Sequence, residues 1–573
     1  MWHYAMKQKG LLFLNFLCVF GFIGIELGLP TLLAKMLDVG IVNQDYDYIK
    51  RMGLWMILLT AVGVVLNLCL SVVGARLNTR LIKEMRNDMM TNIQTYSHQE
   101  YETIGISSLI TRTTNDAFQV MTFMGMILRM GFITPLMFIA SIYMIVRTSP
   151  SLSVFIYGAL PVLLIGIFII AKKSKPLSEK QQSSLDKINM ILRENLTGLR
   201  VIRAFVNERF EEGRFKAENE GYAANSKRLF KLMASAQPGF FFLFNIITVL
   251  VIWFGSVQID AGNLEVGNLI AFIEYIFHAL FSFMLFSVVF MMYPRAAVSA
   301  GRVQEVLDLK AEIVSPKNGV TETPTQGVIR FDDVSFAYPG QTESPVIRDV
   351  SFEAHPGQTV AFIGSTGSGK STLIQLIPRF YDVTKGSVLI DGVDVREYDL
   401  PTLRQKIGYI PQKALLFSGT IRDNLRYGKP DATEEEMLEA IDIAQGTEFI
   451  SQKELGLDEP VSEGGSNFSG GQKQRLAIAR AIIRKPNIYI FDDSFSALDY
   501  KTDAALRHRL KQETTQSTVL IVAQRVSSIM TADKIVVLNE GNVVGIGTHQ
   551  ELLKDCQVYY DIASSQLTEE ELG

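Results

Sequence analysis

The pattern of apolar residues divides the chain into two halves. A helix that crosses a bilayer needs roughly 20 mostly apolar residues. Six segments in the first 300 residues meet this requirement, and several carry no charge across a full bilayer width: 11–37, 52–75, 120–147, 152–171, 238–259 and 267–293. One such segment could be a buried helix of a soluble core. Six in series predict an α-helical transmembrane domain over residues 1–310.

The distribution of Lys and Arg predicts the orientation. The connection 172–235 holds 14 of them and 76–118 holds five, whereas the short connections 148–151 and 260–266 hold none. Positively charged connections stay in the cytoplasm, so the amino terminus and both long connections are expected there. The long connections read as helical extensions of the spans. Their tips, 97–109 and 197–207, could contact a cytosolic domain, although a solvated helical linker fits the same length.

Ionisable residues occur inside the predicted spans: Glu26, Arg129, Glu274 and His278. Such residues at membrane depth are functional candidates by default. Phe and Met residues gather in the sixth span and could form an adaptable apolar surface for ligands: Phe281, Phe283, Met284, Phe286, Phe290, Met291 and Met292. Helix packing explains these apolar positions equally well. The sequence leaves open whether the ionisable residues line a substrate cavity.

The second half carries a phosphate-binding motif. Strand-like and helix-like segments alternate from residue 328, which predicts an α/β domain over 328–573, and 311–327 reads as a linker. The G-x-x-x-x-G-K-[ST] pattern of a phosphate-binding loop is formed by Gly364, Ser365, Thr366, Gly367, Ser368, Gly369, Lys370, Ser371 and Thr372. A β-prone run precedes it and a helical pattern follows, as the motif requires. We therefore expect bound ATP, with Lys370 on its phosphates and Ser371 on Mg²⁺.

An acidic pair completes this site. The β-prone run 488–491 ends in Asp492 and Asp493. A carboxylate after a buried strand is the Mg²⁺-side partner of a phosphate-binding loop, which assigns Asp492 to the metal. Asp493 stands where a carboxylate would orient the attacking water.

The segment 467–475 resembles the ATP-binding cassette (ABC) family. It contains Ser469, Gly470, Gly471 and Gln472, which resemble the signature motif of that family at a helix N-terminus. In this family the signature of one cassette closes over ATP held by the phosphate loop of another. Since the chain has one cassette, the resemblance implies a dimer. Six spans followed by a cassette, with long cytosolic loops, resemble a half-size ABC exporter over essentially the whole chain. The tips 97–109 and 197–207 would then include coupling helices.

Other family motifs follow in the expected order. Tyr338 resembles the aromatic residue that stacks on adenine, and Gln412 resembles the glutamine that senses Mg²⁺ and the γ-phosphate. The stretch 496–499 resembles the loop that crosses to the opposite site. Glu463 resembles an acidic residue that contacts a coupling helix in exporters, although its surroundings match only loosely.

Two positions depart from the family pattern, and both concern hydrolysis. The family usually has Glu where this chain has Asp493, and His where it has Gln524. Asp places its carboxylate about 1 Å short, a displacement that can cost on the order of a hundredfold in rate. Gln524 cannot become a cation near neutral pH. With the signature intact, this asymmetry resembles the degenerate subunit of a heterodimeric bacterial multidrug exporter. A homodimer with two slow sites is the alternative.

Composition narrows the function further. The net charge of −4 argues against a nucleic-acid partner, and the three cysteines show no metal or disulfide spacing, which fits a reducing cytosolic face. The first ten residues do not read as a cleaved signal. We expect a multi-pass protein of the bacterial plasma membrane, with its cassette in the cytoplasm, that exports amphipathic drugs or other hydrophobic compounds. Export of a lipid, peptide or other endogenous compound, or ATP-gated regulation, are the alternatives.

Overall fold

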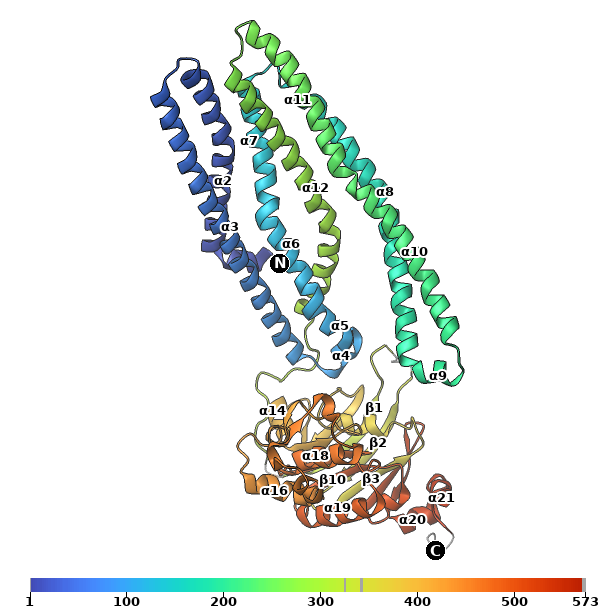
Figure 1. The fold of residues 1–573 in the computed structure, drawn as a ribbon. Coiled ribbons are helices and arrows are strands. Elements are labelled where there is room, and N and C mark those ends of the chain that lie inside the picture. Colours follow the sequence, from blue (N-terminus) through green and yellow to red (C-terminus); the bar gives the residue numbers. More distant parts are fainter. Residues whose placement is uncertain (1, 324–325, 341–343, 569–573) are drawn as a thin grey trace. The chain divides into compact units, whose positions relative to one another are not determined.

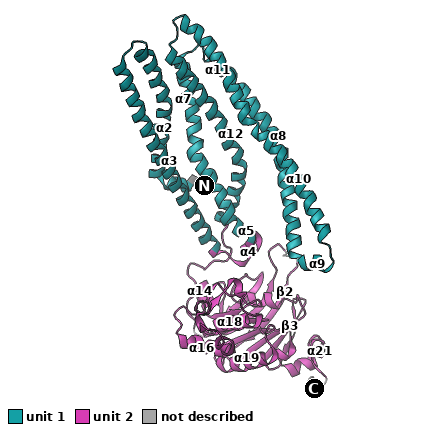
Figure 2. Ribbon diagram, in the orientation of Figure 1, with its two compact units in different colours: residues 1–93, 107–308 teal, residues 94–106, 309–573 magenta. Residues whose placement is uncertain are grey.

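The structure is a computed structural model that describes residues 2–323, 326–340 and 344–568. Its residues form two compact units (Figure 2). The helical unit contains the residues up to 93 together with 107–308. The α/β unit contains 94–106 and the residues from 309 onward.

Six helical segments in the described part of the chain are long and apolar enough to cross a membrane (Figure 1): Lys9–Ile41, Tyr46–Thr95, Ile106–Thr148, Val154–Thr197, Glu208–Asp260 and Val266–Asp308. Five of them contain one segment expected from the sequence, and the fourth begins two residues inside the expected segment 152–171, which confirms the six-span fold class. The helices are α1 (Trp2–Lys7), α2 (Lys9–Lys35), α3 (Tyr46–Thr95), α4 (His98–Ile104), α5 (Ile106–Thr111), α6 (Ala117–Met126), α7 (Phe132–Thr148), α8 (Val154–Thr197), α9 (Leu199–Ala204), α10 (Glu208–Ala234), α11 (Ala236–Asp260) and α12 (Val266–Asp308). Short π-helical stretches lie at Met36–Ile41, Arg112–Asp116 and Ile127–Gly131.

The spans are apolar on all sides because they are surrounded by one another and by lipid. Large side chains such as Ile57 and Trp253 remain exposed, as expected for residues that face hydrocarbon. The interior of the unit is built around α12, whose Phe272 and Tyr275 are fully buried. The Tyr275 hydroxyl lies 2.7 Å from Oγ1 of Thr31 on α2 and closes this pair of helices with a hydrogen bond.

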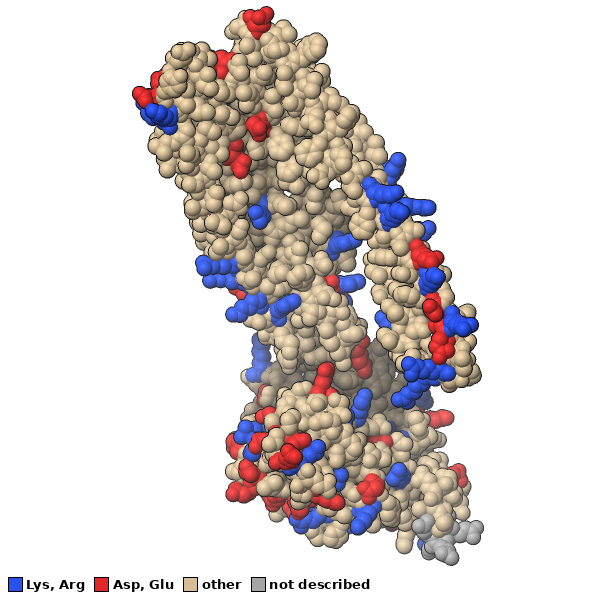
Figure 3. Space-filling model, in the orientation of Figure 1, with Lys and Arg blue, Asp and Glu red and all other residues tan. Residues whose placement is uncertain are grey.

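Among the ionisable residues of the spans, three have a polar partner and the fourth is exposed. Glu26 on α2 and His278 on α12 approach to 3.9 Å between Oε2 and Nε2. Arg129 donates to Oδ1 of Asn67 at 3.4 Å, and Glu274 is exposed on the surface of the unit. On the helical unit, Figure 3 shows charged side chains gathered along α8 and α10, and fewer charges at the end that carries the short connections between spans.

Several helices continue far beyond a bilayer. At 1.5 Å per residue, the 50-residue α3 is about 75 Å long, more than twice the hydrocarbon thickness of roughly 30 Å. Helix α9 forms the tip between α8 and α10, where Phe205 and Val206 are exposed. The expected helical tips therefore exist as α4–α5 and α9, while their role in coupling stays a prediction.

The α/β unit is organised by a six-stranded sheet with the order β12-β11-β3-β10-β9-β6. Its strands are β3 (Thr359–Gly364), β6 (Ile407–Ile410), β9 (Ile488–Asp492), β10 (Thr518–Val522), β11 (Lys534–Asn539) and β12 (Asn542–Gly547). All neighbours in this sheet are parallel except β11 and β12. A four-stranded sheet contains β1 (Ile329–Phe336), β2 (Ile347–Ala354), β4 (Lys385–Ile390) and β5 (Val393–Asp394), and β7 (Gly419–Thr420) pairs with β8 (Pro460–Val461).

Both faces of the six-stranded sheet are buried, one under helices and the other mainly under the four-stranded sheet, and successive residues of β3 enter opposite cores. Ala361 and Ile363 belong to one buried cluster, and Val360 and Phe362 belong to the other. The helices of this unit, besides α4, are α13 (Lys370–Gln375), α14 (Leu400–Gln405), α15 (Ile421–Arg426), α16 (Glu434–Ile443), α17 (Thr447–Ser451), α18 (Gly470–Ile482), α19 (Tyr500–Glu513), α20 (His549–Asp555) and α21 (Gln557–Ser564). Because β3, β9, β10 and β6 are parallel, their carboxyl ends meet at one edge of the sheet.

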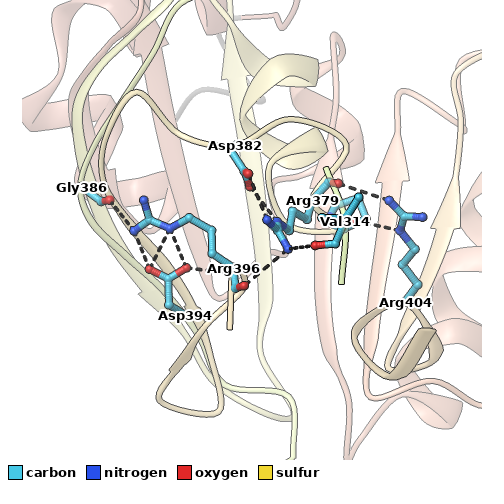
Figure 4. Close-up of polar contacts among 8 residues, drawn as sticks. Val314, Arg379, Asp382, Gly386, Asp394, Arg396 and Arg404 are labelled. Atoms are coloured by element: carbon cyan, nitrogen blue, oxygen red, sulfur yellow. Dashed lines mark hydrogen bonds and ion pairs between the residues drawn. The ribbon is translucent and has the colours of Figure 1, made fainter. Parts of the chain in front are cut away.

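The linker that precedes β1 is fastened to this unit by a buried arginine (Figure 4). Arg379 forms two hydrogen bonds with Asp382, at 2.7 and 3.1 Å, and donates to the carbonyl oxygen of Val314 at 3.3 Å. Arg404 donates in turn to the carbonyl oxygen of Arg379 at 3.3 Å. The domain limits expected from the sequence stay predictions.

Candidate functional site

The phosphate-binding loop connects the carboxyl end of β3 to the start of α13. Gly367 and Gly369 have φ angles of +85° and +96°, a region that disfavours other residues. A Cβ atom on Gly367 would meet nothing within 4 Å, so this part of the loop borders open space. Lys370 Nζ lies over the loop and donates to the carbonyl oxygens of Gly364 and Ser365 at 2.9 and 2.8 Å.

A cavity of about 310 Å³ lies beside this loop. It is lined by Val346, Thr366, Gly367, Gly369, Lys370, Ser371, Thr372, Gln412, Asp493, Val522 and Gln524. Burial lowers the pKa of Lys370, and the carboxylates of Asp493 and Asp492 oppose that shift. A half-buried ammonium beside glycine N–H groups is a site for phosphate oxygens, so ATP fits the residues present.

Asp492 supplies the metal side of the site. It ends the fully buried strand β9 and accepts a hydrogen bond of 2.7 Å from the Ser371 hydroxyl. Tyr409 donates to its second oxygen at 3.1 Å. The described residues contain no group of three His, Cys, Asp or Glu that could hold a metal ion alone. One hydroxyl and one carboxylate fit Mg²⁺, which usually keeps water and phosphate oxygens among its ligands.

Asp493 lies at the centre of a hydrogen-bond network of neutral side chains. Its Oδ2 accepts from Nε2 of Gln524 at 2.7 Å and from Nε2 of Gln412 at 3.0 Å. Its backbone has φ +48°, a conformation that residues other than glycine sparsely populate. Burial raises the pKa of Asp493, while the Gln412 hydrogen bond opposes the shift. The sheet thus brings together the three residues expected to act in hydrolysis, from the ends of β6, β9 and β10.

Tyr338 and Ser368 lie next to this cavity without lining it, whereas Gln412 lines it. The Tyr338 hydroxyl is 2.9 Å from Oγ1 of Thr372. Ser368 is buried, and its hydroxyl accepts from Lys370 Nζ at 3.4 Å. Gln412, expected at the metal, is bonded to Asp493 instead of Asp492. Its part in metal binding stays a prediction.

The signature residues form a separate surface. Ser469 caps α18: its hydroxyl accepts from the Gln472 N–H at 3.3 Å, and its own N–H donates to Oε1 of Gln472 at 3.0 Å. Ser469 and Gly470 are exposed, and none of the four signature residues lines the cavity beside Lys370. A Cβ on Gly471 would lie 3.3 Å from the carbonyl oxygen of Ala497, so the signature packs against the 496–499 loop.

Sequence reasoning missed Tyr409, Val346 and Val522. Tyr409 lies on β6 three residues before Gln412, a spacing that places it on the strand leading into the site. Val346 and Val522 line the cavity through tertiary contacts, and no local motif marks either residue.

Comparison with known proteins gives consistent matches along the chain. Residues 12–291 match the ABC transporter transmembrane region family, and residues 347–496 match the ABC transporter family. An uncharacterized ABC transporter ATP-binding protein of Mycobacterium tuberculosis (strain CDC 1551 / Oshkosh) is 40% identical over 94% of this chain and 93% of that protein. One from Bacillus subtilis (strain 168) is 36% identical over 96% and 95%. An ATP-dependent lipid A-core flippase of Syntrophus aciditrophicus (strain SB) is 29% identical over 95% and 90%.

The fold is shared with a solved structure. A bacterial Atm1-family ABC exporter with ATP bound superposes with a TM-score of 0.81, covering 98% of this chain and 99% of the other at 23% identity.

Proposed function

The chain belongs to the ABC transporter family, and on this premise we propose that it is one subunit of a heterodimeric exporter that binds Mg-ATP firmly and hydrolyses it slowly. Its transmembrane domain followed by a nucleotide-binding domain is the organisation of an exporter half-transporter. It is a six-span protein of the bacterial plasma membrane, with the nucleotide-binding domain in the cytoplasm.

One observation carries the proposal of slow hydrolysis. Asp493 is held by the neutral amides of Gln412 and Gln524 and forms no ion pair in the described part of the chain. A hydrolysing site needs a carboxylate near the attacking water and positive charge near the γ-phosphate. Here the side chain that carries the carboxylate is one methylene shorter than that of Glu, and the neighbouring amide of Gln524 stays neutral.

The binding half of the reaction is intact. Lys370 and the N–H groups of the loop hold the β- and γ-phosphates, and the α13 N-terminus adds its dipole. Ser371 and Asp492 would hold Mg²⁺, which would neutralise charge at those phosphates when bound. The shorter side chain of Asp493 orients the attacking water from too great a distance. The Gln524 amide donates a hydrogen bond to Oδ2 of Asp493. ATP therefore stays bound longer than it would beside a Glu and a His.

The signature surface supports a composite site. Because Ser469 to Gln472 are separate from the cavity beside Lys370, they are available to the ATP of a second subunit. In the proposed heterodimer, the partner carries the Glu and His of the faster site, which this chain completes with its signature.

A second cavity supports hydrophobic cargo. It has a volume of about 730 Å³ and lies among α8, α10, α11 and α12, and it is lined by Leu164, Ile167, Ile170, Ala171, Met233, Ala236, Gln237, Phe241, Phe281, Phe283, Met284, Phe286, Ser287, Val288, Phe290 and Met291. That volume is within the range of small-molecule sites, roughly 300–1,000 Å³. Glu26, Arg129, Glu274 and His278 are not among these residues. We propose amphipathic drugs or other hydrophobic compounds as the substrates.

A lipid is the second candidate, because the same apolar lining accepts acyl chains and because a lipid A-core flippase is 29% identical to this chain. ATP-dependent uptake into inside-out vesicles separates the two, with a cationic amphipathic dye and a fluorescent phospholipid as probes. Uptake of the dye supports drug export, and transfer of the phospholipid alone supports the lipid. If neither the dye nor the phospholipid is transported although the protein binds ATP, the exporter proposal is contradicted.

A further inference from the structure

Helix α4 belongs to the α/β unit although it precedes β1 by more than 200 residues along the chain. Its first turn is fixed by Glu100, which is 5% exposed. One carboxylate oxygen of Glu100 accepts from the Ser97 N–H at 2.7 Å, and the other accepts from the Glu312 N–H at 3.2 Å. The helix is therefore anchored at its own start and to the segment that follows α12.

A second anchor places one side of α4 against an aromatic cluster. The His98 ring meets the Tyr381 ring edge to face, with centroids 5.6 Å apart. Burial raises the pKa of Tyr381, and Glu102 adds to the shift through its charge and a hydrogen bond with the phenol. Tyr381 in turn packs edge to face against Tyr338, with centroids 5.3 Å apart. Glu102 and Tyr338 are thus held on the same cluster.

A cavity of about 470 Å³ lies between α4 and Tyr338. It is lined by Gln99, Glu102 and Thr103 on one side and by Tyr338 and Pro339 on the other. The hydrogen bond between Tyr338 and Thr372, the last residue of the phosphate-binding loop, connects this cavity to the phosphate site. In the described part of the chain, the side-chain amide of Gln99 has no hydrogen-bond partner.

We propose that α4 forms the base-reading wall of the nucleotide site, with Gln99 and Glu102 contacting the edge of an adenine stacked on Tyr338. The proposal rests on ATP binding at Lys370, as proposed above. It assigns recognition of the nucleotide base to a helix of the transmembrane half of the sequence.

The chemistry of the two side chains matches adenine. An adenine edge offers an amine donor next to an acceptor nitrogen, and a glutamine amide pairs with both. The Glu102 carboxylate accepts from the same amine. Guanine offers O6 and N7 on the corresponding edge, two acceptors that a carboxylate repels. The wall therefore favours ATP over GTP.

The test compares Gln99→Ala with Gln94→Ala in the full chain in lipid nanodiscs. Gln94 lies in the same segment, is exposed and does not line the cavity. Binding of ATP, GTP and inorganic tripolyphosphate is measured by displacement of a fluorescent ATP analogue. We expect Gln99→Ala to weaken ATP binding about tenfold, the worth of one bidentate base contact. GTP and tripolyphosphate binding should stay within twofold, and Gln94→Ala should change none of the three.

Equal loss of ATP and GTP binding, or an unchanged ATP affinity, would overturn the base-reading role. Glu102→Gln keeps the shape of the side chain, and it should narrow the preference for ATP over GTP by strengthening GTP binding. No change in that ratio also contradicts the proposal. Lys370→Ala separates this failure from failure of the ATP site: if Lys370→Ala leaves tripolyphosphate binding intact, the phosphate site itself is misassigned.

Discussion

Replacing Asp493 with Glu and Gln524 with His should convert the slow site into a hydrolysing one. The added methylene carries the carboxylate about 1 Å farther into the cavity, a displacement linked to on the order of a hundredfold in rate. That gain corresponds to about 2.7 kcal/mol of activation free energy. The present hydrogen bonds to Oδ2, at 3.0 and 2.7 Å, hold Asp493 in place without adding charge. A His at position 524 adds a donor that can be charged, and hydrogen bonds to charged groups contribute roughly 1.5–3 kcal/mol.

The assay is single-turnover release of ADP from nanodiscs that hold the chain with its partner subunit, and from nanodiscs that hold the chain alone. The expected result is a rise of at least about a hundredfold at this chain's site for the double variant. Asp555→Glu, the same substitution at an exposed position of α20, is the matched control and should leave the rate unchanged. Adding Lys370→Ala to the double variant should abolish the gain.

Two results would refute the reasoning. The first is an unchanged rate in the double variant while ATP binding is preserved. The second is brisk turnover, above about 1 s⁻¹, by the unmodified chain in the absence of any partner, since typical enzymes turn over at that rate or faster. The second result would favour a homodimer with two competent sites.

The remaining predictions concern binding, pH, stability and substrate. Lys370→Ala should raise the dissociation constant for ATP more than tenfold in equilibrium titrations, and an unchanged constant would contradict the assignment of the loop. Because burial raises the pKa of Asp493, hydrolysis should decline with falling pH at a higher pH than for a solvated aspartate, and Asp493→Asn should remove this decline; an acid limb retained in that variant would exclude the carboxylate. Glu100→Ala leaves the N–H of the buried Ser97 without its acceptor and should destabilise the α/β unit by about 1–3 kcal/mol in thermal unfolding, whereas an unaltered midpoint would mean that α4 is not anchored there. Met284→Trp should fill the apolar cavity and reduce dye-stimulated ATPase activity several-fold, whereas Ile139→Trp on the exposed side of α7 should not; equal effects would argue against a substrate site in that cavity.

The elements that local sequence determines were predicted well. A span is specified by the length of its apolar run, because the bilayer sets a minimum of roughly 20 residues. The phosphate-binding loop is specified by closely spaced glycines and Lys370, because its geometry depends on backbone dihedrals within a few residues. The expected strand, loop and helix appear as β3, the loop and α13.

Other features of the site were decided only by the tertiary structure, because they depend on contacts between segments that are distant in the sequence. The meeting of Gln412 and Gln524 on one oxygen of Asp493 requires β6, β9 and β10 to be neighbours, and the order of strands in a parallel sheet is set by packing of the crossover helices rather than by any strand alone. The position of α4 beside Tyr338 likewise follows from the Glu100 and Tyr381 contacts. The ionisable residues of the spans were candidates from sequence because charge in a membrane is costly, yet helix packing places Glu26 next to His278 and outside the apolar cavity. Motifs such as the phosphate-binding loop are determined by adjacent residues, whereas the contacts of a side chain depend on how segments distant in the sequence pack together.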